Sequence, residues 1–199
     1  FLYQFPGVMT PDSLSQYSQA MGLSPFSDHH PFAHTLLIRL LLSLGTALFH
    51  NVYAAIACYT AFQMLLMAVI LCRCLCVLYR YGAGKKLCFL FLLFYACVPY
   101  NGNFAVTMWK DVLFSGFLLL FALSVYQLLH LYSSQERLRK KPGLLVLLLL
   151  SGLLVCLFRS NGLYVFLLSL PFLAFAFRRE WKLLLPGLLL TAALALCIK

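Results

Sequence analysis

The chain has 199 residues, of which 63% are hydrophobic and 10% charged, and its mean hydropathy is +0.93. Soluble domains contain about 45–50% apolar and about 25% charged residues, so this composition excludes an ordinary soluble domain. It also excludes a disordered tail, a collagen-like fibre and a disulfide-rich secreted module. The net charge of +10 would suggest nucleic acid in a soluble protein, but here the basic residues cluster between apolar runs. We therefore expect an all-α fold, a polytopic bundle of transmembrane helices, with membrane lipids and no nucleic acid among its partners.

The two ends of the sequence suggest a piece of a longer chain. It begins at Phe1, and its last stretch, 183–198, is still apolar. We expect residues 1–199 to be a single transmembrane domain, a fragment cut inside the membrane region at both ends. Within it we expect the remnant of a preceding span at 1–5, a first outer loop at 6–50 and transmembrane helices over 51–199.

Six apolar runs separated by polar connections predict about six spans. They cover residues 52–72, 87–99, 112–132, 143–158, 163–177 and 183–198. The second run is short unless it continues through Pro99 toward Phe104. The runs 143–158 and 163–177 fit either two full crossings or one re-entrant hairpin, since both keep their flanks on the same side.

Basic residues predict the orientation of these spans. Eleven of the fifteen fall on one side if the six runs alternate: Arg73, Arg80, Lys85, Lys86, Arg137, Arg139, Lys140, Lys141, Arg178, Arg179 and Lys182. The positive-inside rule assigns that side to the cytoplasm. We therefore expect an integral protein of the cytoplasmic (plasma) membrane, with residues 6–50, 100–111 and 159–162 on the outer face.

A further apolar run, 32–49, could be a seventh span or an interfacial helix. Polar residues recur along it at helical spacing, with Arg39 near its middle: Thr35, Arg39, Ser43, Thr46 and His50. A central Arg costs roughly 2.5–3.5 kcal/mol in a crossing helix, so the interface plane is favoured. With this placement, the outer loop carries one or two juxtamembrane amphipathic helices.

The first of these helices is predicted from Thr10-Pro11-Asp12. Thr10 is a suitable N-cap, Pro11 fits the first helical position and Asp12 lies in the first turn. Leu14, Tyr17 and Met21 share one face of this helix, and Gly22 ends it. A carboxylate held at such an N-terminus suits a general base or a metal ligand, and the alternative is a secondary capping role.

Other ionisable residues also fall on the predicted outer face. Asp28, His29, His30 and His34 precede or begin the run 32–49, Lys110 and Asp111 follow Trp109 at the start of another run, and Arg159 lies in an outer turn. Ionisable residues at membrane depth are functional candidates by default. Arg159 fits phosphate binding, although snorkelling to lipid phosphates is the competing account. No standard metal motif is present, and Asp28 and His30 are the candidate ligands if a divalent cation takes part.

Three segments together resemble one family. The segment Pro6-Gly7-Val8-Met9-Thr10-Pro11-Asp12-Ser13 resembles the first outer loop of GT-C-type polyprenyl-phosphate-sugar glycosyltransferases, which include protein O-mannosyltransferases and aminoarabinose transferases. His30-Pro31-Phe32-Ala33-His34-Thr35 resembles their His-Pro-Pro-Leu-Gly-Lys segment, with Phe32 in place of the second Pro. The stretch from Pro99 to Asp111 resembles the loop before their fourth span, and Asp111 takes the Asp position of Thr-Leu-Asp. The likeness is greatest to bacterial GT-C-like proteins of the cell envelope that have no assigned substrate.

The resemblance implies a membrane glycosyltransferase that moves a hexose or pentose from a polyprenyl-phosphate donor to a glycan, lipid or protein acceptor. Asp12 would be the base of an inverting transfer. Arg159, with Lys110 or Arg39, would bind the phosphate, and Asp28, His29, His30 and Asp111 would bind substrate. A lipid or solute transporter and a non-enzymatic membrane assembly protein are the alternatives from other classes.

Overall fold

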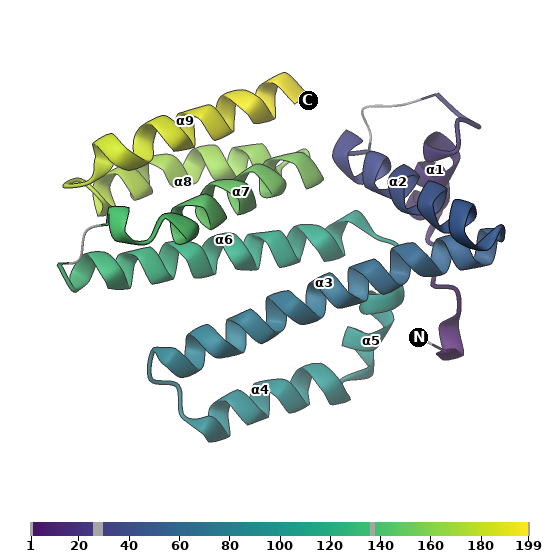
Figure 1. Cartoon of the computed structure of the whole chain (residues 1–199), viewed down its shortest axis with the longest axis horizontal. Coiled ribbons are helices and arrows are strands. Elements are labelled where there is room, and N and C mark those ends of the chain that lie inside the picture. The colour runs from purple at the N-terminus through teal and green to yellow at the C-terminus, as the bar shows by residue number, and fades with distance from the viewer. Residues whose placement is uncertain (1, 26–29, 136–137, 199) are drawn as a thin grey trace. The chain divides into compact units, whose positions relative to one another are not determined.

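The computed structural model describes residues 2–25, 30–135 and 138–198, and these residues are mostly helical (Figure 1). They contain one isolated parallel β-bridge, between Val8 and Thr107. The all-α prediction is therefore confirmed for these residues. The elements run in the order η1 (Leu2–Gln4), α1 (Pro11–Ala20), α2 (Phe32–Phe49), α3 (Val52–Arg80), α4 (Lys85–Cys97), α5 (Pro99–Val106), α6 (Lys110–Ser133), η2 (Leu138–Lys140), α7 (Pro142–Phe158), α8 (Gly162–Ala176) and α9 (Trp181–Ile198).

The chain divides into two compact units, Phe1–Leu113 and Phe114–Lys199. The boundary falls near the start of α6, so the first turn of this helix belongs to the first unit. Each unit has its own set of packed helices.

In the first unit, α2 and α3 form a helical hairpin with a tight turn (Figure 1). His50 ends α2 in the left-handed conformation (φ 51°), and Asn51 caps α3 by accepting a hydrogen bond from the Tyr53 backbone N–H at 2.8 Å. The two helices approach closely at Gly45, where a Cβ would lie 2.6 Å from the Cα of Ala55. A glycine at this position therefore lets α2 pack on α3.

The second predicted span is bent. Helix α4 ends at Cys97, Val98 is extended (φ −77°, ψ 113°), and α5 starts at Pro99 with a change of direction of 62°. A residue before proline disfavours the helical conformation, while proline suits the first position of a new helix. The run does continue past Pro99, but as a broken pair of helices and not as one straight helix.

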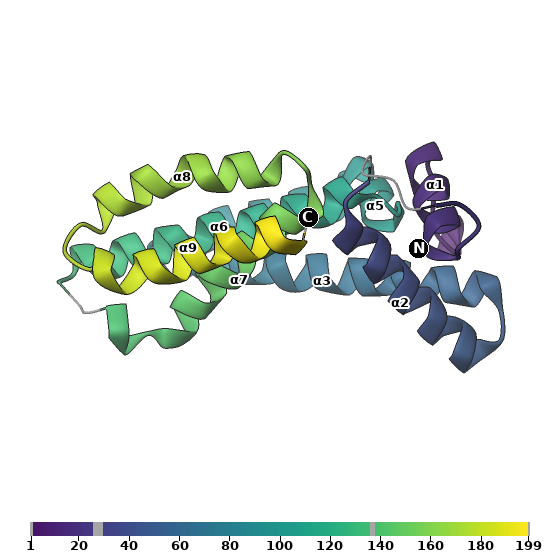
Figure 2. The ribbon, with the colours of Figure 1, turned by 90° about the horizontal axis from the view of Figure 1, so that it is seen from above.

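In the second unit, α7, α8 and α9 pack on one another (Figure 2). The turn between α7 and α8 is tight enough to require a glycine at position 162, because a Cβ there would overlap the Val155 carbonyl oxygen. Gly152 of α7 likewise gives room to the Phe166 ring of α8. A Cβ at position 152 would lie 2.6 Å from the Cε2 atom of that ring. Small residues thus set the spacing of this hairpin.

Several helices are compatible with an integral membrane protein. Among the described residues, α2, α3, α6 and α9 are long and apolar enough to cross a bilayer, and the bent pair α4–α5 raises the number to five if it counts as one span. Helices α7 and α8 are apolar but have 17 and 15 residues, less than the length of about 20 that a bilayer needs. About six full crossings therefore stay a prediction, as does the interfacial placement of α2.

Candidate functional site

Helix α1 begins as its sequence predicts. Thr10 is the N-cap, Pro11 occupies the first turn, and Asp12 follows in that turn. Ser13 completes a capping box with Thr10, because each side chain pairs with the backbone N–H of the other, at 3.1 and 3.2 Å. The helix ends at Ala20, and Gly22 then takes a positive φ of 73°. The local sequence therefore determines that Asp12 lies in the first turn of α1.

The buried face of α1 is its polar face. Ser13, Gln16 and Gln19 are buried, whereas Leu14 and Met21, on the apolar face, are 53% and 48% exposed. Soluble amphipathic helices normally bury the apolar face. The reversal arises because the partners of α1 inside this unit offer hydrogen bonds, which a buried amide or hydroxyl requires.

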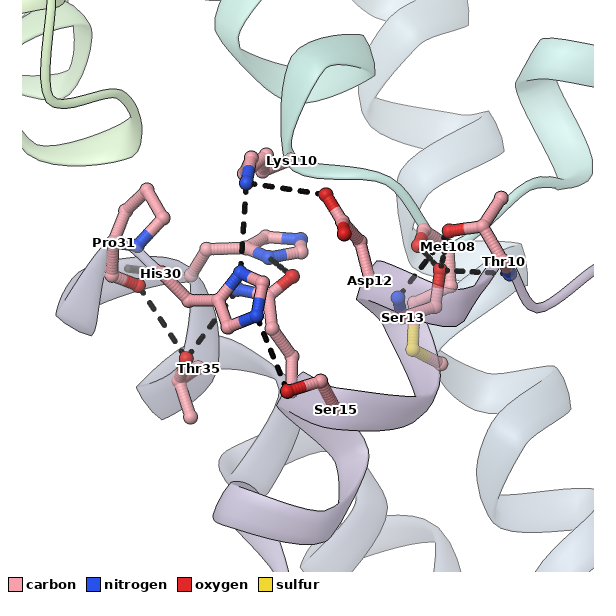
Figure 3. A network of polar contacts seen from close by, with 11 residues as sticks. Thr10, Asp12, Ser13, Ser15, His30, Pro31, Thr35, Met108 and Lys110 are labelled. Atoms are coloured by element: carbon pink, nitrogen blue, oxygen red, sulfur yellow. Dashed lines mark hydrogen bonds and ion pairs between the residues drawn. The ribbon is translucent and has the colours of Figure 1, made fainter. Parts of the chain in front are cut away.

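Asp12 forms an ion pair with Lys110, a residue 98 positions later at the start of α6 (Figure 3). The Lys110 Nζ lies 3.4 Å from the Asp12 Oδ2, and the two side chains are 14% and 46% exposed, respectively. The carboxylate is thus open to solvent on one side while its cation is nearly buried. A partly exposed carboxylate beside a sheltered cation can contact a substrate from its open side.

His30 joins this pair from the segment before α2. Its Nδ1 lies 3.5 Å from the Lys110 Nζ, and its Nε2 lies 3.2 Å from the Ser15 Oγ (Figure 3). An ammonium group has no acceptor, so the Nδ1 accepts from Lys110 and the Nε2 carries the proton toward Ser15 in a neutral ring. We call Asp12, Ser15, His30 and Lys110 the outer polar cluster, after the face on which the sequence predicts their segments to lie.

Backbone contacts hold Lys110 opposite Asp12. The Val8 backbone N–H donates to the Val106 carbonyl at 3.0 Å, and the Met108 N–H donates to the Val8 carbonyl at 3.0 Å. Ser13, next to Asp12, donates its hydroxyl hydrogen to the Met108 carbonyl. The hydrogen-bonded segments around Val8 and Met108 therefore bring the start of α6 to the N-terminus of α1.

A buried chain of hydrogen bonds lies behind the outer polar cluster. His34 contacts Gln16 through its Nδ1 at 3.0 Å and Tyr59 through its Nε2 at 2.7 Å. The Tyr59 hydroxyl donates to the Gln63 Oε1 at 3.1 Å, and the Gln63 Nε2 donates to the carbonyls of Ala105 and Thr107 at 2.9 and 2.8 Å. His34, Tyr59 and Gln63 have essentially no exposed surface. This chain, Gln16–His34–Tyr59–Gln63, joins α1, α2 and α3 to the segment that leads to Lys110.

Several candidate residues of the sequence analysis lie elsewhere. Asp111 follows Lys110 in the first turn of α6 and is half-buried. Arg39 is exposed on α2 and is not among the described residues that contact the outer polar cluster. Arg159 ends α7 in the second unit, where its guanidinium lies 5.5 Å from the centre of the Phe114 ring. Asp28 and His29 lie outside the described residues.

The described part of the chain contains no group of three or more His, Cys, Asp or Glu side chains that could hold a metal ion. Of the two candidate ligands, His30 contacts Ser15 and Lys110, and Asp28 lies outside the described residues. A divalent cation therefore stays a prediction that rests on the sequence.

Sequence reasoning missed most of the buried chain. It grouped His34 with the ionisable residues of the predicted outer face, but the His34 side chain is fully buried between Gln16 and Tyr59. The available signal was Gln63, the one amide side chain in the long apolar helix α3. A polar residue at that depth is expected to have a partner, although the sequence does not say which.

Comparison with known proteins identifies the family of this chain. A family model described as "Family of unknown function (DUF6020)" matches residues 21–198. No curated protein and no solved structure matches. The matched range includes His30, His34 and Lys110, while Asp12 precedes it. Because the match covers most of its length, the chain belongs to the DUF6020 family.

Proposed function

We propose that this protein is a GT-C-like glycosyltransferase that moves a sugar from a polyprenyl-phosphate donor to an acceptor on the outer face of the plasma membrane. The observation that carries the proposal is the Asp12–Lys110 pair, a half-exposed carboxylate 3.4 Å from a sheltered ammonium group. A transfer of this kind needs a base for the acceptor and a cation for the departing phosphate. The pair supplies one group of each kind in one place.

In the proposed reaction, the Asp12 carboxylate takes the proton from an acceptor hydroxyl as its oxygen attacks the anomeric carbon. The bond between that carbon and the phosphate oxygen breaks, and its electron pair leaves with the polyprenyl phosphate. Attack from the side opposite the leaving group inverts the configuration at the anomeric carbon. Asp12 suits the role of base because α1 holds it rigidly at an N-terminus.

Lys110 is the cation that we assign to the departing phosphate, once the substrate has separated its Nζ from Asp12, because the base and the leaving group lie on opposite sides of the anomeric carbon. His30, whose Nε2 faces Ser15, would orient sugar hydroxyls. Arg159 stays a phosphate-binding candidate of the sequence analysis alone, on the strength of its predicted outer position. These roles are inferred from the resemblance of the sequence to GT-C-type glycosyltransferases.

The outward orientation rests on charge. Basic clusters are expected on the cytoplasmic side, and the segments that carry Asp12, His30 and Lys110 alternate with them along the chain. A lipid-linked donor would then enter from the bilayer, past the apolar helices, to a site at its outer surface.

The test is transfer by membrane vesicles that contain the protein, given polyprenyl-phosphate sugars with a radiolabelled hexose or pentose. We expect Asp12→Asn to lower transfer by at least about 100-fold, the usual contribution of a general base. It should leave the stability within about 1 kcal/mol, because a half-exposed ion pair contributes little. Glu180→Gln, a matched loss of one acid outside the site, should transfer at the parental rate. Equal transfer by the parent and Asp12→Asn would contradict the proposal.

A further inference from the structure

The second unit contains a cavity of about 380 Å³ at the end where α6 finishes and α8 leads into α9. Two arginines and the end of α6 line it, with one aromatic ring from α8: Tyr132, Ser133, Gln135, Phe175, Arg178 and Arg179. Ligand pockets in proteins range from about 300 to 1,000 Å³, so this cavity, which we call the arginine cavity, is large enough for a small ligand.

The walls of the arginine cavity are built by specific contacts. The Arg179 Nη1 donates to the Gln135 Oε1 at 3.2 Å, and the Arg179 backbone N–H donates to the Tyr132 hydroxyl at 3.4 Å. The Tyr132 ring packs edge-on against the fully buried Phe177 ring, with centroids 5.6 Å apart. An arginine that only anchors a helix needs no such partners, because it extends freely to the headgroups. Here the Arg179 side chain is exposed, and its guanidinium has a side-chain partner, Gln135, at the cavity wall.

The charge of this site favours an anion. Arg178, Arg179 and Lys182 stand within five residues, with Glu180 as the acid between them. Guanidinium groups bind phosphate oxygens through paired N–H donors, and the Tyr132 hydroxyl, which accepts from the Arg179 backbone N–H, adds a neutral donor at the same cavity. A phosphate group therefore matches the chemistry of the lining.

The surroundings favour a phosphate that belongs to a lipid. Phe175 lines the cavity and is 77% exposed, and Phe172, one turn earlier on α8, is exposed as well. These rings form an apolar surface that leads along α8 to the cavity. Acyl chains could lie on that surface while the headgroup occupies the cavity, whereas a free phosphate would leave the rings uncovered.

We propose that the arginine cavity binds the headgroup of an anionic phospholipid. The positive-inside rule predicts this end of the second unit to face the cytoplasmic leaflet, where anionic lipids attract basic segments. The proposal is independent of sugar transfer, because no residue of the cavity belongs to the outer polar cluster.

Native mass spectrometry of the full chain, released from nanodiscs of equal parts phosphatidylglycerol and phosphatidylcholine, tests the proposal. We expect the parent to retain phosphatidylglycerol, and Arg178→Gln/Arg179→Gln to retain it at least about tenfold less, since the variant loses the charge-assisted hydrogen bonds from two guanidinium groups to the phosphate. Lys140→Gln/Lys141→Gln is the matched control, because it removes two exposed charges outside the cavity and should retain the lipid within about twofold. Equal losses from both double variants would overturn the proposal.

Two further arms separate the source of the phosphate and guard against misfolding. Phe175→Ser changes an exposed ring and keeps both arginines, so it should fold and still lower retention of phosphatidylglycerol. Unchanged retention in this variant would overturn the lipid placement. Inorganic phosphate at millimolar concentration should displace little of the lipid; complete displacement would show a site for free phosphate and would also overturn the lipid assignment.

Discussion

Gln63 and Asp12 each form polar contacts with residues that are far away in the sequence. Gln63 lies inside an apolar helix, and its amide joins Tyr59 to the carbonyls of Ala105 and Thr107. Asp12 lies at the start of α1 and pairs with Lys110, 98 positions away. Both contacts act on the segment 104–110, so the buried chain behind the site and the ion pair in front of it hold the same piece of backbone.

Gln63→Leu should destabilise the protein by at least about 2 kcal/mol. The change keeps the size of the side chain but leaves the buried Tyr59 hydroxyl and two carbonyls without their partner, and each such group costs about 1–3 kcal/mol. Thermal unfolding of the purified chain measures the loss. Gln4→Leu is the control, since it removes one exposed hydrogen bond to Asn103 and should change the stability by less than about 0.5 kcal/mol. Equal unfolding temperatures for Gln63→Leu and the parent would show that the buried chain does not support the fold.

At the scale of elements, the sequence predicts boundaries well where local chemistry decides them. Thr10 and Pro11 start α1 as predicted. Asn51 caps α3 and Pro99 starts α5 through equally local contacts, although the sequence analysis did not assign them these roles. It does not predict which face of α1 is buried, because that face is chosen by α2 and by the segment before α6. The burial of His34 could not be predicted for the same reason, because its partners come from two other helices.

The α7–α8 hairpin offers a test of how tightly elements pack. Gly162→Ala should destabilise the second unit by more than about 1 kcal/mol, because the new methyl group meets the Val155 backbone, which cannot rotate away. Gly143→Ala, in the first turn of α7, has open space around it and should be neutral or stabilising by up to about 1 kcal/mol. The two variants are compared by thermal unfolding in the same detergent. Equal stability of the two would contradict the close approach of the helices.

At the scale of the whole molecule, composition predicts an apolar helical protein, and the structure confirms the helices. The candidate site is less predictable, since the sequence suggests Asp12, His30 and Lys110 individually and the fold brings them together. Arg39 shows the limit of that reasoning. Its place in a polar stripe suggests a binding role, but a stripe also forms where one side of a helix is simply exposed.

The predicted orientation is tested by labelling in intact cells with an impermeant maleimide, on single cysteines in a cysteine-free background. Leu23→Cys, at an exposed position after α1, should react from outside. Gly84→Cys, exposed between α3 and α4 and next to Lys85, should react only after the membrane is permeabilised. The reverse pattern would place the outer polar cluster on the cytoplasmic side and would exclude the proposed outward site.

The most direct test of sugar transfer at Asp12 is a comparison of surface glycans by mass spectrometry in cells with the protein, without it, and with Asp12→Asn. We predict that one glycan loses a hexose or pentose when the protein is absent, that the parent gene restores this sugar, and that Asp12→Asn inserts normally but does not restore it. Identical glycans with and without the protein, or full restoration by Asp12→Asn, would contradict the account.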